Sequence, residues 1–364
     1  MIAPKNPDEE VWKARVRVPA RVVVIFTRQL AAMLVSGVPI VQALETLSHQ
    51  AEVPNFGQVV RILSEKISSG HPFSHALNQF PRIFPRIYVT MVSIGEQTGA
   101  LDHSLEKLAD WWERDHMIYQ RIKSALSYPI FVLCLAGTLT LGLFYWVLPG
   151  FIGIFRDMNV ELPFVTRVVI AITNGVRDPG AWLITIAVLG ASFTLLRDFA
   201  RTARGSQQLF LMATRVPLLG GMLKNGSMAR YCGAVSALLS SGMDLPRCFK
   251  LSAAASGNPL LDADAQAMVD DIMEGGIASD HMLRRPDLYP GSMVQMVIAG
   301  EQASRMPDMF GRAASYYDLE MNYQVDALSA ALEPLLLAGV ASVVGTIVIS
   351  VFLPMYGYLG KLGA

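Results

Sequence analysis

The chain has 364 residues, of which 52% are hydrophobic and only 16% are charged. Soluble domains carry about 25% charged residues, so this composition predicts long apolar segments and disfavours an ordinary soluble protein. Lys+Arg and Asp+Glu number 30 each, and this balance gives no electrostatic reason to expect nucleic-acid binding. The length predicts two or three domains, each able to bury its own core.

Residues 1–25 are interpreted as a short N-terminal arm. They contain acidic residues early, and their apolar run Val22–Phe26 is too short for the hydrophobic region of a secretory signal. We therefore expect the chain to begin in the cytoplasm. The cysteines are too widely spaced for a disulfide framework, and we expect all three to be reduced and buried, namely Cys134, Cys232 and Cys248.

Residues 26–124 are predicted to form a helical bundle. Apolar side chains recur there at three- and four-residue steps, as in Phe26, Leu30, Leu34 and Val38. Glycine and proline clusters mark the turns, and no run alternates apolar and polar residues long enough to predict a strand. Late in this region, a helix is expected to end near Gly95, the chain to turn at Gly99, and the next helix to begin by Leu101.

Three long apolar runs predict membrane-spanning helices at residues 125–149, 179–197 and 334–358. About 20 apolar residues suffice to cross the hydrocarbon core. Buried helices of soluble proteins are the alternative, but these rarely stay apolar on all sides for so long. Tyr145 and Trp146 suit the aromatic belt at a membrane surface.

Flanking charges orient these spans. Lys and Arg precede the first span and follow the second, at Arg114, Arg121, Lys123, Arg197, Arg201, Arg204 and Arg215. Because such residues concentrate in the cytoplasm, we expect the N-terminus and residues 198–333 there, and 150–178 and 359–364 in the periplasm. Acidic residues before the third span, and Lys361 after it, argue for the opposite orientation of that span. The first span usually dominates, so the N-in, C-out orientation is kept.

An internal duplication relates the two halves of the chain. FTRQLAAMLVSGVPI, from Phe26, aligns with YCGAVSALLSSGMDL, from Tyr231, and Glu301 likewise follows Glu96 by 205 residues. The same offset relates two prolines interpreted as membrane-entry residues, Pro129 and Pro334. A constant offset over so long a stretch is hard to obtain by chance. We therefore expect a cytoplasmic linker at 198–230 and a second helical bundle at 231–333, with the unduplicated second span returning the chain to the cytoplasm.

The repeated Gly-Glu-Gln, which begins at Gly95 and again at Gly300, allows three interpretations. In the first, its glutamates Glu96 and Glu301 are catalytic carboxylates; in the second they bind a ligand; in the third they are structural residues at a helix junction. A general acid or base needs a partner group, and no carboxylate or histidine is repeated beside them. We favour the structural interpretation, in which Glu96 satisfies backbone donors or pairs with a cation while Asp102 stabilises the first turn of the next helix.

Other candidate chemistry is weaker. The sequence lacks the P-loop, nucleophile-elbow, zincin and Cys-x-x-Cys patterns, so it indicates no enzyme class, cofactor or metal. His71 and His75 flank a predicted helix start without a further ligand, and we interpret them as solvated. The paired aromatics Trp111-Trp112 and Tyr316-Tyr317 are predicted to pack in the core or near the membrane surface.

The apolar runs of the predicted spans, of which the second ends at Leu196, carry no Asp, Glu, Lys, Arg or His, whereas transporters usually place such residues towards the bundle interior. A membrane transporter is therefore the least favoured class. Small residues at four-residue spacing, such as Ala341 and Gly345, fit close helix packing within or between protomers. They fit equally well the ordinary abundance of small residues in membrane helices.

The combined motifs resemble the type II secretion F family, the multi-pass inner-membrane platform proteins of type IV pilus and type II secretion machines. The resemblance is carried by FTRQLAAMLVSGVPIVQALETL, SIGEQTGALDHSLEKLADWW, LSYPI and LEPLLL, and it covers Phe26 to about Tyr358. It implies two six-helix cytoplasmic bundles, three membrane helices and self-association into dimers or larger oligomers. It also implies contact with a hexameric cytoplasmic assembly ATPase, with pilin or prepilin subunits and with other inner-membrane pilus assembly proteins.

The second copy departs from the family pattern. Ala303-Ser304-Arg305 stands where the first copy has Thr98-Gly99-Ala100, and Met243-Asp244 replaces the usual Val-Pro. Where both copies contact a partner in members of the family, we therefore expect that only the first copy keeps the contact in this chain. The short arm before Phe26 leaves less material for a partner-docking tail, and a compact chain of this kind suggests a type IVb or plasmid-type pilus.

The sequence thus predicts an all-α integral membrane protein without enzymatic activity, located in the bacterial inner membrane. Its expected function is to couple a cytoplasmic assembly ATPase to the insertion of pilin subunits into a growing type IV pilus. The alternative is the equivalent platform of a type II secretion system, which builds a pseudopilus.

Overall fold

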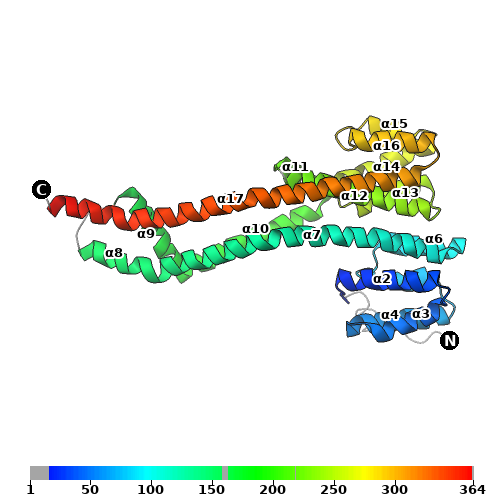
Figure 1. The fold of residues 1–364 in the computed structure, drawn as a ribbon, viewed down its shortest axis with the longest axis horizontal. Coiled ribbons are helices and arrows are strands. Elements are labelled where there is room, and N and C mark those ends of the chain that lie inside the picture. The colour runs from blue at the N-terminus through cyan, green and yellow to red at the C-terminus, as the bar shows by residue number, and fades with distance from the viewer. Residues whose placement is uncertain (1–15, 158–162, 218, 363–364) are drawn as a thin grey trace. The chain divides into compact units, whose positions relative to one another are not determined.

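The computed structural model describes residues 16–157, 163–217 and 219–362 (Figure 1). These described residues are largely helical and contain no strand, which confirms the predicted all-α class. The helices form two compact units. We name them the bundle unit, Met1–Arg121 with Phe210–Tyr323, and the apolar unit, Ile122–Leu209 with Gln324–Ala364.

The first half of the bundle unit is a helical bundle, as predicted. Its described residues form α2 (Ala20–Val35), α3 (Ile40–Gln50), α4 (Pro54–Ser68), α5 (Phe73–Leu77), α6 (Arg86–Thr98) and the first part of α7 (Leu101–Gly142). Proline marks the start of each of the first five helices. Pro54 is the first residue of α4, where its fixed φ suits the helix and its missing N–H would have had no partner. Extended prolines directly precede α2, α3, α5 and α6, at Pro19, Pro39, Pro72 and Pro85.

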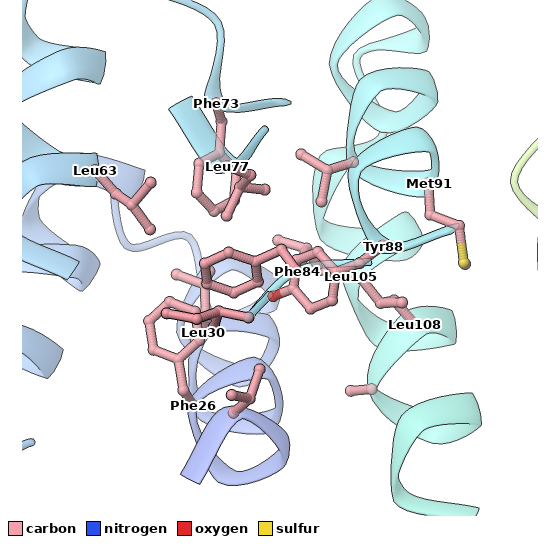
Figure 2. Packing of buried hydrophobic residues seen from close by; sticks show 14 of the residues in the cluster. Phe26, Leu30, Leu63, Phe73, Leu77, Phe84, Tyr88, Met91, Leu105 and Leu108 are labelled. Carbon is pink, nitrogen blue, oxygen red and sulfur yellow. The ribbon is translucent and has the colours of Figure 1, made fainter. Parts of the chain in front are cut away.

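The core of this first bundle is apolar and rich in aromatic rings (Figure 2). The ring of Phe26 meets Phe56 edge to face, with centroids 5.2 Å apart, and Phe84 lies 4.9 Å from Tyr88. The Tyr88 hydroxyl is 3.1 Å from the Thr27 hydroxyl, so its polar end is satisfied inside the core, and burial raises the pKa of Tyr88. Each such buried side chain contributes about 1.5–3 kcal/mol, which explains why the short helices stay folded.

The second half of the bundle unit repeats this order of helices. It consists, in the described residues, of α12 (Leu219–Ser240), α13 (Leu245–Ala255), α14 (Pro259–Met273), α15 (Ala278–Leu283), α16 (Gly291–Gln302) and the first part of α17 (Met306–Leu362). The turns are duplicated in detail. Gly37 and Gly242, which follow α2 and α12, have φ angles of 83° and 88°.

The corner between α6 and α7 is tighter than the sequence suggested. The expectation that a helix ends near Gly95 is wrong, because α6 continues to Thr98 and only then turns at Gly99, which has φ 72°. Gly95 instead permits close helix packing, since a Cβ there would lie 2.7 Å from the Cβ of Ser104. The second copy keeps the left-handed turn with a non-glycine residue, Ser304, at φ 52°.

The second bundle also contains a buried polar network. Asp264 accepts hydrogen bonds from Arg285 (2.6 Å) and Tyr289 (2.9 Å), and its Oδ2 lies 3.0 Å from His281. The other ring nitrogen of His281 bonds to Asp271. The positions equivalent to Asp264, His281, Arg285 and Tyr289 are apolar in the first bundle, at Val59, Ala76, Phe80 and Phe84, and Asp271 corresponds to Lys66. Sequence analysis did not single out this network.

The apolar unit agrees with the three predicted spans. Three helices of the described chain are long and apolar enough to cross a membrane, and their apolar stretches lie in α7, α10 (Pro179–Arg201) and α17. Pro129 lies inside α7 and Pro334 inside α17. After α7 the chain makes one π-helical turn, η1 (Leu143–Val147), and continues as α8 (Leu148–Asp157).

Two further helices flank α10. One is α9 (Phe164–Arg177), and the other is α11 (Ala203–Arg215). Val169 of α9 packs with Phe144, Leu148 and Ile347 of the same unit. The buried Thr166 hydroxyl donates to the carbonyl of Ser350 at 3.0 Å. The stretch between the first two spans is therefore helical where described and contacts the third apolar helix.

Asp264→Asn is expected to destabilise the second bundle by about 3 kcal/mol, because it leaves the partners of a buried carboxylate without their counter-charge. Cys232 and Cys248 are buried in this half and report its unfolding through a thiol-reactive dye. The measurement is thermal unfolding of the full chain in a Cys134→Ser background. Asp262→Asn, on the exposed side of the same helix, is the control and changes stability by at most about 0.5 kcal/mol. Equal unfolding temperatures for the two variants would contradict a stabilising network.

Candidate functional site

Glu96 holds the start of a short helix in the first bundle. One carboxylate oxygen accepts the backbone N–H of Phe73, and the other accepts the Ser74 N–H at 3.0 Å and the Ser74 hydroxyl at 2.5 Å. These donors open α5, where the first N–H groups have no partner within the helix. Pro72, the residue before α5, supplies no side-chain cap. Glu96 therefore caps α5 from α6, and a charged acceptor makes these bonds stronger than neutral ones.

Glu301 makes a reduced version of the same contact. Its carboxylate accepts the N–H of Ser279, at the start of α15, at 3.1 Å. Ser279 is the equivalent of Ser74, but among the described hydrogen bonds its hydroxyl does not reach Glu301. The glutamate and the serine are the same in both copies, whereas Ala278 stands where the first copy has Phe73. Among the described hydrogen bonds, the first copy holds its helix start with three and the second with one.

The surroundings of Glu96 do not form a reacting pair. It lines an open cavity of about 570 Å³ with Ser74, His75 and Asn78, and the donors already described occupy its oxygens. The exposed rings of His71 and His75 stack on each other with centroids 6.1 Å apart. Among the described residues, no three His, Cys, Asp or Glu side chains gather to hold a metal. The geometry is that of a positioned structural carboxylate.

The remaining residues of the motif lie at the same corner. Gly95 is buried in α6 and Gly99 ends that helix, while Asp102 is exposed in the first turn of α7. Gly300 repeats the close approach, since a Cβ there would lie 3.0 Å from the Cβ of Met309. The structure therefore brings Gly95, Glu96, Gly99 and Asp102 together in one copy, and Gly300 and Glu301 in the other.

The two bundles meet through apolar side chains. Ala234, Ala237, Leu238 and Cys248 of the second half join the buried core of the first half. Trp111 of α7 lies against Gly233 of α12, where a Cβ would come within 3.1 Å of the indole ring. The tryptophan pair is thus used in packing, with Trp112 edge to face on Tyr88 at 5.7 Å.

An ion-pair cluster of the first copy is missing from the second. Arg28 lies 2.7 Å from Asp110 and 2.7 Å from Glu113, and these hydrogen bonds, that to Glu113 foremost, raise its pKa. The equivalent positions in the second copy are Gly233, Ser315 and Asp318. Loss of the arginine opens the position that Trp111 occupies, and it leaves Oδ1 of Asp318 buried without a hydrogen-bond partner among the described residues.

Comparison with known proteins finds the same duplication. The family model described as type II secretion system (T2SS), protein F matches twice, at residues 26–149 and 231–354, and the two matches are again 205 residues apart. The chain belongs to the type II secretion system protein F family. The predicted family and the internal repeat are therefore confirmed.

Curated relatives of this family member carry two kinds of name. A type IV pilus assembly protein PilC of Thermus thermophilus is 31% identical, with 98% of this chain and 89% of the relative covered. A protein of the same name from Pseudomonas aeruginosa is 28% identical over 92% of the chain and 89% of its own length. A type II secretion system protein F of Xanthomonas campestris pv. campestris is 30% identical, covering 93% of the chain and 83% of the relative.

Sequence reasoning found the motif but not all of its partners. The offset of 205 residues located Glu96 and Glu301. It did not indicate that their donors lie 22 to 23 residues upstream, at the start of another helix. Serine at the equivalent positions 74 and 279 was the available signal.

Glu96→Ala is expected to expose the start of α5 more than Glu301→Ala exposes the start of α15. Removing three charge-assisted bonds costs about 2 kcal/mol, and removing one costs about 1 kcal/mol. The measurement is hydrogen–deuterium exchange of the full chain, read at peptides covering residues 73–77 and 278–283. Glu96→Gln keeps part of the acceptor set and is the matched control. Equal acceleration at both sites would show that the additional bonds of Glu96 contribute nothing.

Proposed function

We propose that this chain is the inner-membrane platform of a type IV pilus assembly machine, and that it couples a cytoplasmic assembly ATPase to the insertion of pilin subunits. The duplicated helical bundle joined to apolar helices is the observation that carries the proposal, and the relatives named for type IV pilus assembly support it. The sequence contains no P-loop, so energy for assembly has to come from a partner.

Each repeat ends in one helix that contributes to both units. The first part of α7 belongs to the bundle unit and its later part to the apolar unit, and the same holds for α17. A helix shared in this way is a direct covalent route from bundle to membrane. We propose that the bundles contact the ATPase and that the apolar helices contact pilin, other inner-membrane assembly proteins, the lipid bilayer and further copies of the chain.

The proposed topology places both bundles in the cytoplasm. Residues 26–124 and 231–333 are the cytoplasmic bundles, and residues 150–178 and the C-terminal tail lie in the periplasm. The Lys and Arg residues beside the first two apolar stretches support this orientation. It also keeps the two copies of one domain on the same side of the membrane, where the same partner can reach both.

A second function has its own support. Relatives named type II secretion system protein F match almost as much of the chain, at 30% identity for the Xanthomonas protein. The same platform would then serve a pseudopilus. Neighbouring genes separate the two functions: a prepilin with a retraction system accompanies a pilus platform, and outer-membrane secretion components accompany a secretion platform.

Co-purification tests the coupling to the ATPase. The full chain in detergent is expected to retain the cognate assembly ATPase, and charge-reversing substitutions on exposed bundle surfaces are expected to weaken retention. Charge-reversing substitutions near the C-terminus, which the proposed topology places in the periplasm, are the control. Failure of the intact chain to retain the ATPase, under conditions that preserve the fold, would remove the coupling from the proposal.

Reporter fusions test the topology. A reporter active only in the periplasm is expected to be active after Gly175 and after Ala364, and inactive after Leu209. A reporter active only in the cytoplasm should give the reverse pattern. A cytoplasmic signal at position 175 would overturn the orientation of the first two spans.

A further inference from the structure

A large cavity lies within the bundle unit, between α7 of the first bundle and α12 and α17 of the second. Its volume is about 790 Å³. The two long helices line it with equivalent residues, since Lys107, Trp111 and Arg114 of α7 correspond to Arg312, Tyr316 and Leu319 of α17. We call this cavity the inter-bundle groove. It exists because the two copies face each other.

Divergence of the second copy opens the groove. In the first copy, Arg28 and Asp110 occupy the equivalent surface and bind each other. The second copy has Gly233 and Ser315 at those positions, and both line the groove. Two short residues thus replace a charged pair. The Trp111 indole lies against Gly233, and the shorter Ser315 lines the groove where the first copy has Asp110.

Three cationic side chains line the groove. Lys107 and Arg312 line it, and neither forms an ion pair with another described residue. Arg114 also lines it; within the described part of the chain it donates to the Ser315 hydroxyl, at 3.4 Å, and interacts electrostatically with Asp318. Its acidic lining residues have partners outside the groove: Asp110 pairs at 2.7 Å with Arg28, which it shares with Glu113, and Asp308 pairs with Arg305 at 3.1 Å.

Donors outnumber free acceptors in this groove. Trp111 is 8% exposed, and its indole nitrogen, which can only donate, has no partner in the described part of the chain. Three cationic side chains therefore face a cavity whose own carboxylates are engaged. Such a surface attracts carboxylates or other anions and repels basic segments.

Size and spacing decide between a small anion and a peptide. Cavities of about 300–1,000 Å³ suit ligands well above the size of a single inorganic anion. Lys107 and Arg114 are seven residues apart on one helix, which is about 10 Å of rise. An extended peptide covers that distance in about three residues, so acidic side chains a few residues apart reach both cations.

We propose that the inter-bundle groove binds an acidic peptide segment of a partner protein, with its carboxylates on Lys107, Arg114 and Arg312. The lining residues belong to the bundle unit rather than to the apolar stretches, which favours a peptide over a lipid headgroup. The inference does not depend on the assembly ATPase being the partner, because the groove and its charge are properties of this chain alone.

The test uses the full chain in nanodiscs of uncharged phosphatidylcholine and a fluorescent 12-residue peptide with four spaced glutamates. Fluorescence anisotropy is expected to show saturable binding that weakens as salt is raised. The double substitution Lys107→Glu and Arg312→Glu is expected to weaken binding at least tenfold. The same peptide with glutamine in place of glutamate should not bind.

Arg61→Glu with Arg82→Glu is the matched control, since it changes the net charge equally at exposed positions outside the groove. Binding by this control should stay within twofold of the unmodified chain. The groove variant should instead bind a lysine peptide of the same length, a gain that a misfolded bundle would not show. Low dye reactivity of the buried Cys232 and Cys248, in a Cys134→Ser background, verifies its fold.

Three results would overturn the proposal. One is equal weakening by the groove variant and the control, which would mean non-specific attraction. Another is full displacement of the peptide by an equal concentration of inorganic pyrophosphate, which would indicate a small-anion site. The third combines two measurements: vesicles containing anionic lipid displace the peptide, and the peptide does not crosslink to a photoreactive benzoylphenylalanine that replaces Ser236 in the groove. That result would indicate a lipid site.

Discussion

The close approach of α6 to α7 at Gly95 is the constraint from which the first bundle is organised. A side chain at this position would overlap Ser104, so the two helices pack this tightly only around glycine. The next residue, Glu96, is thereby directed to the start of α5, where it satisfies backbone donors that the helix cannot satisfy itself. One tight helix corner therefore also fixes the beginning of a helix that lies elsewhere in the chain.

The second bundle keeps this corner and changes what surrounds it. Gly300 and Glu301 repeat the packing and the cap, and Ser304 repeats the left-handed turn despite its side chain. A non-glycine residue in that conformation costs about 1–2 kcal/mol, so the surrounding contacts must hold it there. Away from the corner, Asp264 and His281 replace apolar core residues with a charged network. Duplication thus preserved the backbone constraint, while the cores diverged.

Divergence also gave the two copies different surfaces for each other. Arg28, Asp110 and Glu113 form an ion-pair cluster in the first copy, and the second copy has Gly233, Ser315 and Asp318 instead. The glycine admits Trp111, so a lost salt bridge became an apolar contact between bundles. Identical copies could not pack in this way, because an arginine at position 233 would occupy the space of the indole ring. The two bundles therefore present different side chains at equivalent positions, and each contacts different residues of the other.

The sequence by itself determined the class, the duplication and the three apolar helices. These depend on periodic or additive properties: helical spacing of apolar residues, a constant offset of 205 residues, and long runs without charge. It also identified Glu96 and Glu301 as a repeated pair, but it placed a helix end near Gly95, where α6 continues to Thr98. Only the tertiary structure decided which donors Glu96 meets, that Asp264 and His281 are partners, and that Trp111 packs on Gly233. Such contacts join residues distant in the chain, and their geometry follows from how the helices pack rather than from any local pattern.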